Sequence, residues 1–180
     1  MSVIKPLLLF TMVALSACAY QPTPYKVVQQ EKYEQGALAG LYQLGVTEER
    51  ISQSEYVITV KLDGGSDPQR ARNMLMLHAS KLALTSGYKH FKKSQLKAGS
   101  WCNKSRNKVT NKISFAEGGP SAKAKVSFVH ANESNFKKNK THFNAEKLIE
   151  RLEPIVNKVI TQEVADSNAN KRMRICWNKR

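Results

Sequence analysis

Residues 56–68 read YVITVKLDGGSDP, and this stretch decides the fold. Its first half alternates between apolar and other side chains, with the apolar ones at Tyr56, Ile58, Val60 and Leu62. A period of two is typical of a β-strand that buries one face. The second half stops the strand with two glycines and then supplies Ser66 and Asp67 as candidate helix N-caps, Pro68 for the first turn and Gln69 at the capping-box position. The stretch therefore predicts a strand that leads through a tight turn into a helix.

The predicted helix should end at Gly87, because glycine readily adopts the backbone conformation that closes a helix. Its buried stripe falls at helical spacing, on Ala71, Met74 or Leu75, His78, Ala79 and Leu82. A second strand is expected from about Tyr88, with His90 and Phe91 inside it.

A lysine-rich β-hairpin is expected next, with its turn at residues 117–120, which read Glu-Gly-Gly-Pro. Apolar residues alternate on both sides of that turn, at Val109, Ile113, Phe115, Ala122, Ala124, Val126 and Phe128. The opposite face would carry Lys108, Lys112, Lys123 and Lys125. Like charges on neighbouring strand positions are mildly destabilising, so these lysines are the candidate contact with an anionic partner. The alternative is that they form only a solvated face.

The last third predicts one more helix, capped by Asn144 and kinked or restarted at Pro154. Its apolar stripe comprises Leu148, Ile149, Leu152, Val156, Val159, Ile160 and Val164. Residues 167–170 are expected to form a loop, and residues 174–177 a short strand. The order of elements predicts the α+β class: a single small domain, mainly antiparallel sheet, with two helices on one face.

The charge of the chain is large and uneven. The sequence has 29 Lys and Arg against 14 Asp and Glu. Residues 18–88 carry seven of each sign, whereas residues 89–140 carry thirteen basic side chains and two acidic ones, a net charge of +11. A small soluble domain usually needs a net charge of about 2 to 8 for solubility. The excess in one segment therefore predicts a localised positive surface.

Residues 1–18 have the layout of a secretory signal. Lys5 precedes an apolar stretch over residues 7–17, which is too short to remain as an anchor because a spanning helix needs roughly 20 apolar residues. The stretch ends in Leu15-Ser16-Ala17-Cys18, which resembles the lipobox of bacterial lipoproteins. The resemblance implies cleavage before Cys18 and acylation of that cysteine. The alternative is an ordinary signal peptide with a chance cysteine.

These features predict three parts of the chain. Residues 1–17 would be the cleaved signal peptide, and residues 18–54 the lipidated Cys18 with a tether and a loosely packed lead-in. Residues 55–180 would form the α+β domain with its basic hairpin and basic tail. Ala19 follows the cysteine where an Asp would imply retention at the inner membrane of enteric bacteria, so we expect the periplasmic face of the outer membrane.

The expected partners follow from this address. The membrane is contacted through the lipid anchor, and the lysines would meet anionic lipid, an acidic glycan or an acidic envelope protein. Nucleic acid would be the default partner of so basic a cytoplasmic domain, but an exported one is not expected to meet it.

Cys102 and Cys176 remain once Cys18 is assigned to lipid. An even number of cysteines in an oxidising compartment predicts a disulfide, which would close a loop of about 75 residues and join the lysine-rich middle to the basic C-terminal region. The alternative is two unpaired buried thiols.

Residues 15–91 resemble a family of small uncharacterised proteobacterial lipoproteins. The features shared are the lipobox, the strand at residues 56–60 and the helix that ends in Gly87-Tyr88-Lys89-His90-Phe91. The family has a Glu where this chain has Lys81, and an Asp where it has Lys89. The resemblance implies no known activity, cofactor or catalytic residue.

No arrangement for catalysis, metal binding or cofactor binding is recognisable in the chain. The four histidines are scattered, and the cysteines lack the paired spacing of zinc sites. Gly64-Gly65 is expected to be a tight turn, since no phosphate-binding lysine follows it. His78 is expected to be a hydrogen-bonded core residue. We therefore expect a non-enzymatic envelope lipoprotein that contacts an anionic partner, the alternative being an enzyme or enzyme accessory of the envelope.

Overall fold

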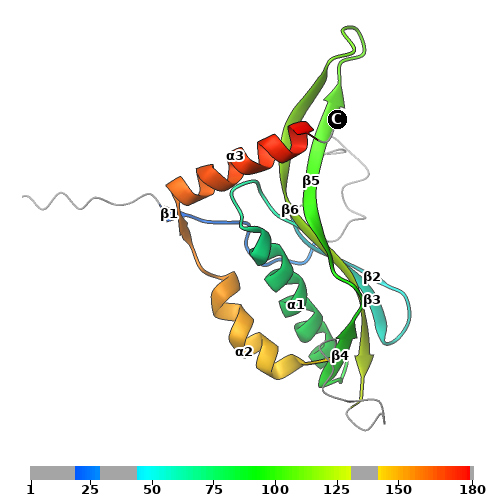
Figure 1. Cartoon of the computed structure of the whole chain (residues 1–180). Coiled ribbons are helices and arrows are strands. Elements are labelled where there is room, and N and C mark those ends of the chain that lie inside the picture. The colour runs from blue at the N-terminus through cyan, green and yellow to red at the C-terminus, as the bar shows by residue number, and fades with distance from the viewer. Residues whose placement is uncertain (1–18, 29–43, 131–141, 179–180) are drawn as a thin grey trace, which may run out of the picture.

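The computed structural model describes residues 19–28, 44–130 and 142–178, and these residues form an α+β fold with three helices and an antiparallel sheet (Figure 1). The predicted fold class is therefore confirmed. The predicted signal peptide, residues 1–17, and the predicted lipidation site, Cys18, lie outside the described residues.

The strand and helix predicted from residues 56–68 are both present. Strand β3 spans Glu55–Lys61, and every second side chain along it is buried. Helix α1 spans Pro68–Thr85, with Asp67 as its N-cap; the Asp67 side chain accepts a hydrogen bond from the Gln69 N–H. Gly87 follows the helix at a φ of 83°, a left-handed conformation that glycine adopts without strain.

The main sheet is antiparallel and is built around one long strand, β6 (Ile113–Val129). The strand order is β2 (Gly45–Arg50), β3, β6, β4 (His90–Lys93) and β7 (His142–Asn144), with β5 (Lys97–Arg106) also paired to β6. β4 and β5 pair with successive parts of the same edge of β6. β6 therefore runs from the helix-covered part of the sheet into a hairpin that projects beyond it (Figure 1).

The helices lie on one side of this sheet (Figure 1). α1 contacts β3 and β6, where its buried residues meet Ala122, Ala124 and Val126. α2 (Ala145–Val156) packs mainly against α1. Asn144 is its N-cap, as predicted, and the Asn144 side chain accepts a hydrogen bond from the Lys147 N–H. α3 (Gln162–Asn178) crosses β5 and β6 on the same side.

Of the two alternatives predicted at Pro154, a kinked helix continuous to Val164 is wrong, whereas a restart agrees with the second helix that follows. α2 ends at Val156, two residues beyond Pro154. A two-residue strand, β8 (Ile160–Thr161), then precedes α3.

The loop and short strand predicted after residue 166 are also wrong, because both lie within α3. Asparagine and serine favour a helix weakly, but tertiary contacts override that preference. Ala165 and Cys176 are buried, and the Asn168 side-chain amide donates to the Gly65 carbonyl at 3.0 Å. The predicted disulfide between Cys102 and Cys176 is present and fastens α3 to β5.

The predicted hairpin is misplaced by several residues. Residues 117–120 lie inside β6, and the turn spans residues 107–112. The Asn107 side chain accepts hydrogen bonds from the backbone N–H groups of Val109 and Thr110, and Asn111 has a φ of 56°, which is turn chemistry that asparagine supports.

Gly118 and Gly119 are needed in β6 because backbone and sulfur atoms of other segments lie close to the strand there. A Cβ atom on Gly119 would lie 1.9 Å from the Leu62 carbonyl oxygen, and one on Gly118 would lie 2.8 Å from the Cys176 sulfur. Glycine in a strand often marks a close approach of another segment. A Gly-Gly pair also occurs in turns, which is why the turn was predicted at residues 117–120.

The predicted tether and loose lead-in are wrong for the part of residues 18–54 that the structure describes. β1 (Ala19–Tyr20) pairs with β8, and Ala19 lies opposite Thr161. Thr23 is buried, and β2 is a full strand of the sheet. The folded domain therefore includes Ala19 and does not begin at residue 55.

Candidate functional site

The strand register places five lysines on the sheet face opposite the helices. Ala122, Ala124 and Val126 of β6 are buried under α1, so the alternate residues Lys123 and Lys125 point the other way. Directly opposed residues of paired strands point to the same face of a sheet. The lysines of β3, β4 and β5 that lie opposite outward-pointing residues of β6 therefore share the face of Lys123 and Lys125. We call these the sheet lysines: Lys61, Lys92, Lys97, Lys123 and Lys125.

Charge is concentrated within this group. Lys97 lies directly opposite Lys123, so two like charges occupy one cross-strand pair, an arrangement that is destabilising in a sheet. Glu55 on the same face forms an ion pair with Lys125, with 3.0 Å between nitrogen and oxygen. Hydrogen bonds from Lys125 and Ser127 lower the pKa of Glu55. Lys125 is therefore neutralised by an acidic neighbour, whereas Lys97 and Lys123 stand opposite a like charge.

The structure does not bring together the four lysines that were predicted to form one surface. Lys123 and Lys125 belong to the sheet lysines, whereas Lys108 and Lys112 lie in the turn of the β5–β6 hairpin. Ten residues of β6 separate Ile113 from Lys123, which corresponds to about 33 Å of strand. We call residues 106–113 the hairpin tip; it exposes Val109 almost completely (94%).

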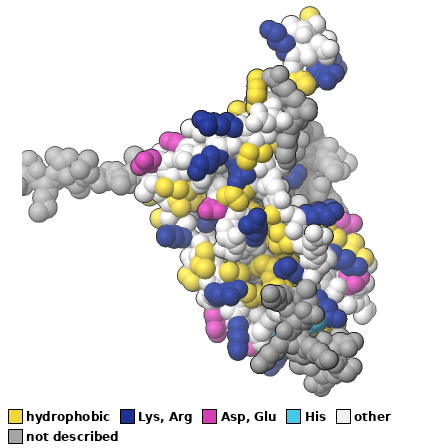
Figure 2. All heavy atoms as spheres, in the orientation of Figure 1, with side chains coloured by type: hydrophobic (Ala, Val, Ile, Leu, Met, Phe, Trp, Pro, Cys, Tyr) yellow, Lys and Arg dark blue, Asp and Glu magenta, His cyan; other side chains and the backbone are white. Residues whose placement is uncertain are grey.

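Three of the sheet lysines were not singled out from the sequence. Lys61 falls on the outward side of the strand predicted at residues 56–62, so its direction could have been inferred. Lys92 and Lys97 lie on this face because of the register in which β4 and β5 pair with β6. The register between distant strands could not be predicted from the sequence alone. Figure 2 displays Lys and Arg side chains over the visible surface and at the projecting hairpin.

A second polar cluster surrounds Asp63 and holds the first described residues of the chain. Its carboxylate accepts hydrogen bonds from the Tyr20 hydroxyl (2.5 Å), from the Thr23 N–H (2.7 Å) and from the Thr23 hydroxyl. The Ser66 hydroxyl also donates to it, at 3.0 Å. Burial alone would raise the pKa of Asp63, but these hydrogen bonds outweigh burial and hold that pKa below 3.8.

Arg70 reinforces the cluster from α1. Its guanidinium donates to the Thr23 carbonyl at 3.0 Å and to the Lys158 carbonyl at 3.3 Å. Burial lowers the pKa of Arg70, and the charge of Asp63 opposes that shift. Asp63 and Arg70 therefore join residues 19–23 to α1 and to the segment that enters β8.

A partly buried chain of hydrogen bonds links Tyr25, His78 and Glu48. The Tyr25 hydroxyl lies 2.8 Å from His78 Nδ1, and His78 Nε2 lies 2.5 Å from a carboxylate oxygen of Glu48. Burial is the main cause that lowers the pKa of His78, which favours the neutral ring, with Nε2–H donating to Glu48. The expectation that His78 is a hydrogen-bonded core residue is confirmed.

This chain of side chains does not have the properties of an activated nucleophile. Burial and the nearby carboxylates Glu48 and Glu153 raise the pKa of Tyr25, so its phenolate form is disfavoured. An activating site would lower that pKa. The arrangement fits a structural link between β2, α1 and the segment around Tyr25.

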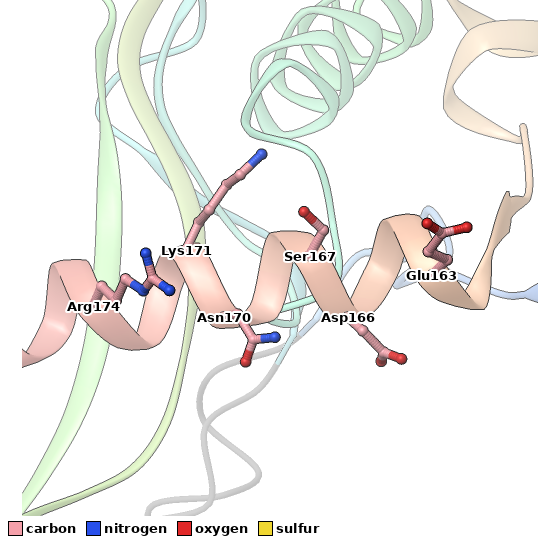
Figure 3. Close-up of a pocket in the computed structure, with 6 residues that line it drawn as sticks. All are labelled: Glu163, Asp166, Ser167, Asn170, Lys171 and Arg174. Atoms are coloured by element: carbon pink, nitrogen blue, oxygen red, sulfur yellow. The ribbon is translucent and has the colours of Figure 1, made fainter.

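Two hollows open on the surface around α3. One, of about 620 Å³, is lined in the described chain by Glu163, Asp166, Ser167, Asn170, Lys171 and Arg174, all from α3 (Figure 3). Because one helix supplies these side chains and they carry both charges, this hollow has no convergent set of groups for one ligand. The other, of about 270 Å³, lies between α1, β5 and α3, where Arg172 donates to the Ser100 hydroxyl at 2.7 Å.

Among residues 19–28, 44–130 and 142–178, no three His, Cys, Asp or Glu side chains are grouped so as to hold a metal ion. Within the same ranges, none of the helices is both long and apolar enough to cross a membrane.

Comparison of the chain with protein-family models, with curated proteins and with solved structures found no match.

Proposed function

We propose that this protein is a cell-envelope lipoprotein, anchored by acylated Cys18 at the periplasmic face of the outer membrane, whose sheet lysines bind an anionic partner. The role is binding and not catalysis. The observation that carries the proposal is the cross-strand pair Lys97 and Lys123, because it keeps two exposed like charges directly opposite one another.

The chemistry of the sheet lysines favours a broad anionic surface or polymer over a small ligand. Lysine is a compact, strongly hydrated charge on a flexible stem, so it contacts carboxylate and phosphate without fixing their orientation. Alternate residues on a strand are roughly 7 Å apart, and paired strands are about 5 Å apart, which spreads the charges over a flat array. Anionic lipid, an acidic glycan and an acidic envelope protein all meet this description.

The test is a binding series with soluble protein, in which Cys18→Ser replaces the anchor. Alginate, an acidic polysaccharide, is immobilised, and vesicles containing phosphatidylglycerol are used in parallel. Wild-type binding should weaken steeply between low and physiological salt, because exposed charges are screened beyond about 8 Å at 0.15 M. Replacing Lys92, Lys97, Lys123 and Lys125 with Gln should weaken it at least about tenfold, since each lysine near an anionic surface contributes about 1 kcal/mol.

A matched control removes the same charge from elsewhere. Replacing Lys147, Arg151, Lys171 and Arg174 with Gln changes four exposed side chains of α2 and α3, on the helical side of the sheet, and should weaken binding far less. A third variant, Lys108→Gln with Lys112→Gln, reports on the hairpin tip. Equal losses in the sheet variant and the control variant would mean that net charge alone governs binding, and the sheet lysines would not be the site.

A further inference from the structure

The first residues after the proposed lipidation site are built into the fold. Ala19 and Tyr20 pair with Thr161 and Ile160, and the Tyr20 ring lies against Gly65, where an added Cβ would be 2.9 Å from the ring. Asp63 and Arg70 then hold Thr23 from two sides. Cys18 precedes Ala19 directly, so the point at which an acyl chain is attached to Cys18 lies within one residue of this part of the surface.

The surface next to this point is partly apolar. Ile155, Val159 and Val164 are each about half exposed, at 49%, 47% and 48%, and the last two flank β8. Figure 2 displays hydrophobic side chains close to where the described chain begins. Lys158 is exposed among them, with Glu163 and Asp166 on the first turns of α3. We call residues 155–164 the anchor-side surface.

The sheet lysines lie on the other side of the helical layer. β1 and β8 contact α3, which lies with the other helices on one side of the sheet (Figure 1). The strand register turns the sheet lysines to the opposite side. A helix with its side chains is about 10–12 Å in diameter, and the Debye length at physiological salt is about 8 Å. Charges on the outer face are therefore screened from a bilayer that touches the anchor-side surface.

We propose that the mature protein has no effective tether: its lipid holds the anchor-side surface directly on the bilayer, and Ile155, Val159 and Val164 rest in the interface. This inference rests on the proposed lipidation of Cys18. The sheet lysines then face away from the anchoring membrane, so their partner is an acidic polymer of the periplasm, of the glycan class, and not the headgroups of that same membrane.

The test is amine-reactive footprinting of the acylated protein on phosphatidylcholine vesicles, with labelled lysines quantified by mass spectrometry. The reference is the soluble Cys18→Ser protein. The label on Lys158 should fall by about fivefold on vesicles, because interfacial contact buries the residues around it. The label on Lys123 and Lys97 should change by less than about twofold, since they face water in both samples.

Two variants make the result specific. A Gly-Ser linker inserted between Cys18 and Ala19 keeps the lipid but releases the domain, so Lys158 should regain its label. The pair Val159→Ser and Val164→Ser should restore the label in part, with vesicle association unchanged. Protection of Lys123 in place of Lys158, or no difference between the two, would overturn the orientation. Failure of the wild-type protein to acquire lipid or to co-sediment with vesicles would instead contradict the proposed function.

Discussion

Asp63 is the centre of a hydrogen-bond cluster that joins separate segments of the chain. Three side-chain hydroxyls and one backbone N–H donate to its carboxylate, and these come from Tyr20, Thr23 and Ser66. A carboxylate that accepts several hydrogen bonds is strongly favoured over its protonated form. The residue thereby joins the start of the described chain to the turn between β3 and α1.

Asp63→Asn should lower the free energy of unfolding by roughly 2–3 kcal/mol at pH 7. The asparagine amide would present N–H groups to donors, and an unmatched buried donor costs about 1–3 kcal/mol. Urea unfolding measures the loss, and limited proteolysis at Lys26 should accelerate in the same variant. Asp166→Asn is the control, because its carboxylate is exposed and accepts a hydrogen bond from Gln162 on its own helix, so its effect should stay within about 0.5 kcal/mol. Equal stability of the two variants would contradict the role of Asp63.

His78 should give the protein an acid-sensitive stability near neutral pH. Burial, with a smaller contribution from the charge of Lys81, holds its folded-state pKa below 6.5, and the hydrogen bond to Glu48 only partly offsets this. The unfolded chain therefore takes up a proton as pH falls through 6.5 while the folded chain resists it. Stability should be full above 6.5 and fall below it, by up to about 1.4 kcal/mol per pH unit.

The measurement is the urea midpoint of the wild-type protein and of His78→Gln at several pH values from 7.5 to roughly 5, the window set by the lowered pKa of His78. Gln lacks the titrating ring, so its curve should be flatter over this window whatever its absolute stability. Parallel curves would show that His78 is not the titrating group. Asp63 contributes at lower pH, since its stabilisation is lost only as pH falls below 3.8.

At the scale of elements, the glycines of β6 decide where the long strand can run. Gly119→Ala should destabilise the protein by at least about 3 kcal/mol or prevent folding, because its Cβ would overlap the Leu62 carbonyl oxygen. Gly99→Ala in the paired strand β5 is the matched control: apart from its two chain neighbours, no atom of the described residues lies within 4 Å of its added Cβ, so stability should change by less than about 0.5 kcal/mol. Urea unfolding of both variants checks this, and a tolerated Gly119→Ala would contradict the close crossing.

Local patterns predicted some elements because local chemistry formed them. The alternation at residues 56–62, the Asp67 cap and the Asn144 cap each act within a few residues, and β3, α1 and α2 begin where they indicate. α3 could not be predicted in this way, because its polar residues are held helical by distant partners such as Gly65 and Ser100. The same holds for β1, which forms only by pairing with β8.

The hairpin error explains why the candidate site was only half predicted. Gly118 and Gly119 read as a turn because glycine signals a turn and a close backbone crossing equally well. The direction predicted for Lys123 and Lys125 is nevertheless correct, because the alternation of side chains along a strand is local. Their true neighbours, Lys92 and Lys97, depend on a register with β6 that only the folded sheet defines.

At the scale of the whole molecule, the sheet lysines and the basic side chains of the hairpin tip form two separate groups. The sheet lysines form one flat surface, and the hairpin tip carries Arg106, Lys108 and Lys112 at the end of a projecting arm (Figure 1). An arm that reaches beyond the helices can meet a partner from a different direction than the sheet does. The two variants proposed for these surfaces therefore separate contributions that net charge alone would merge.

The pairing of Ala19 with Thr161 also sets an order of events in time. A peptidase that cuts before Cys18 needs the chain around the cut in an extended, accessible form, and β1 is no longer accessible once β8 has closed on it. In the exported lipoprotein proposed here, residues 160–161 would emerge long after residue 19, which would leave an interval for removal of the leader. For the lipoprotein proposed here, acylation and cleavage must finish within that interval. Processing must therefore be faster than the pairing of β1 with β8.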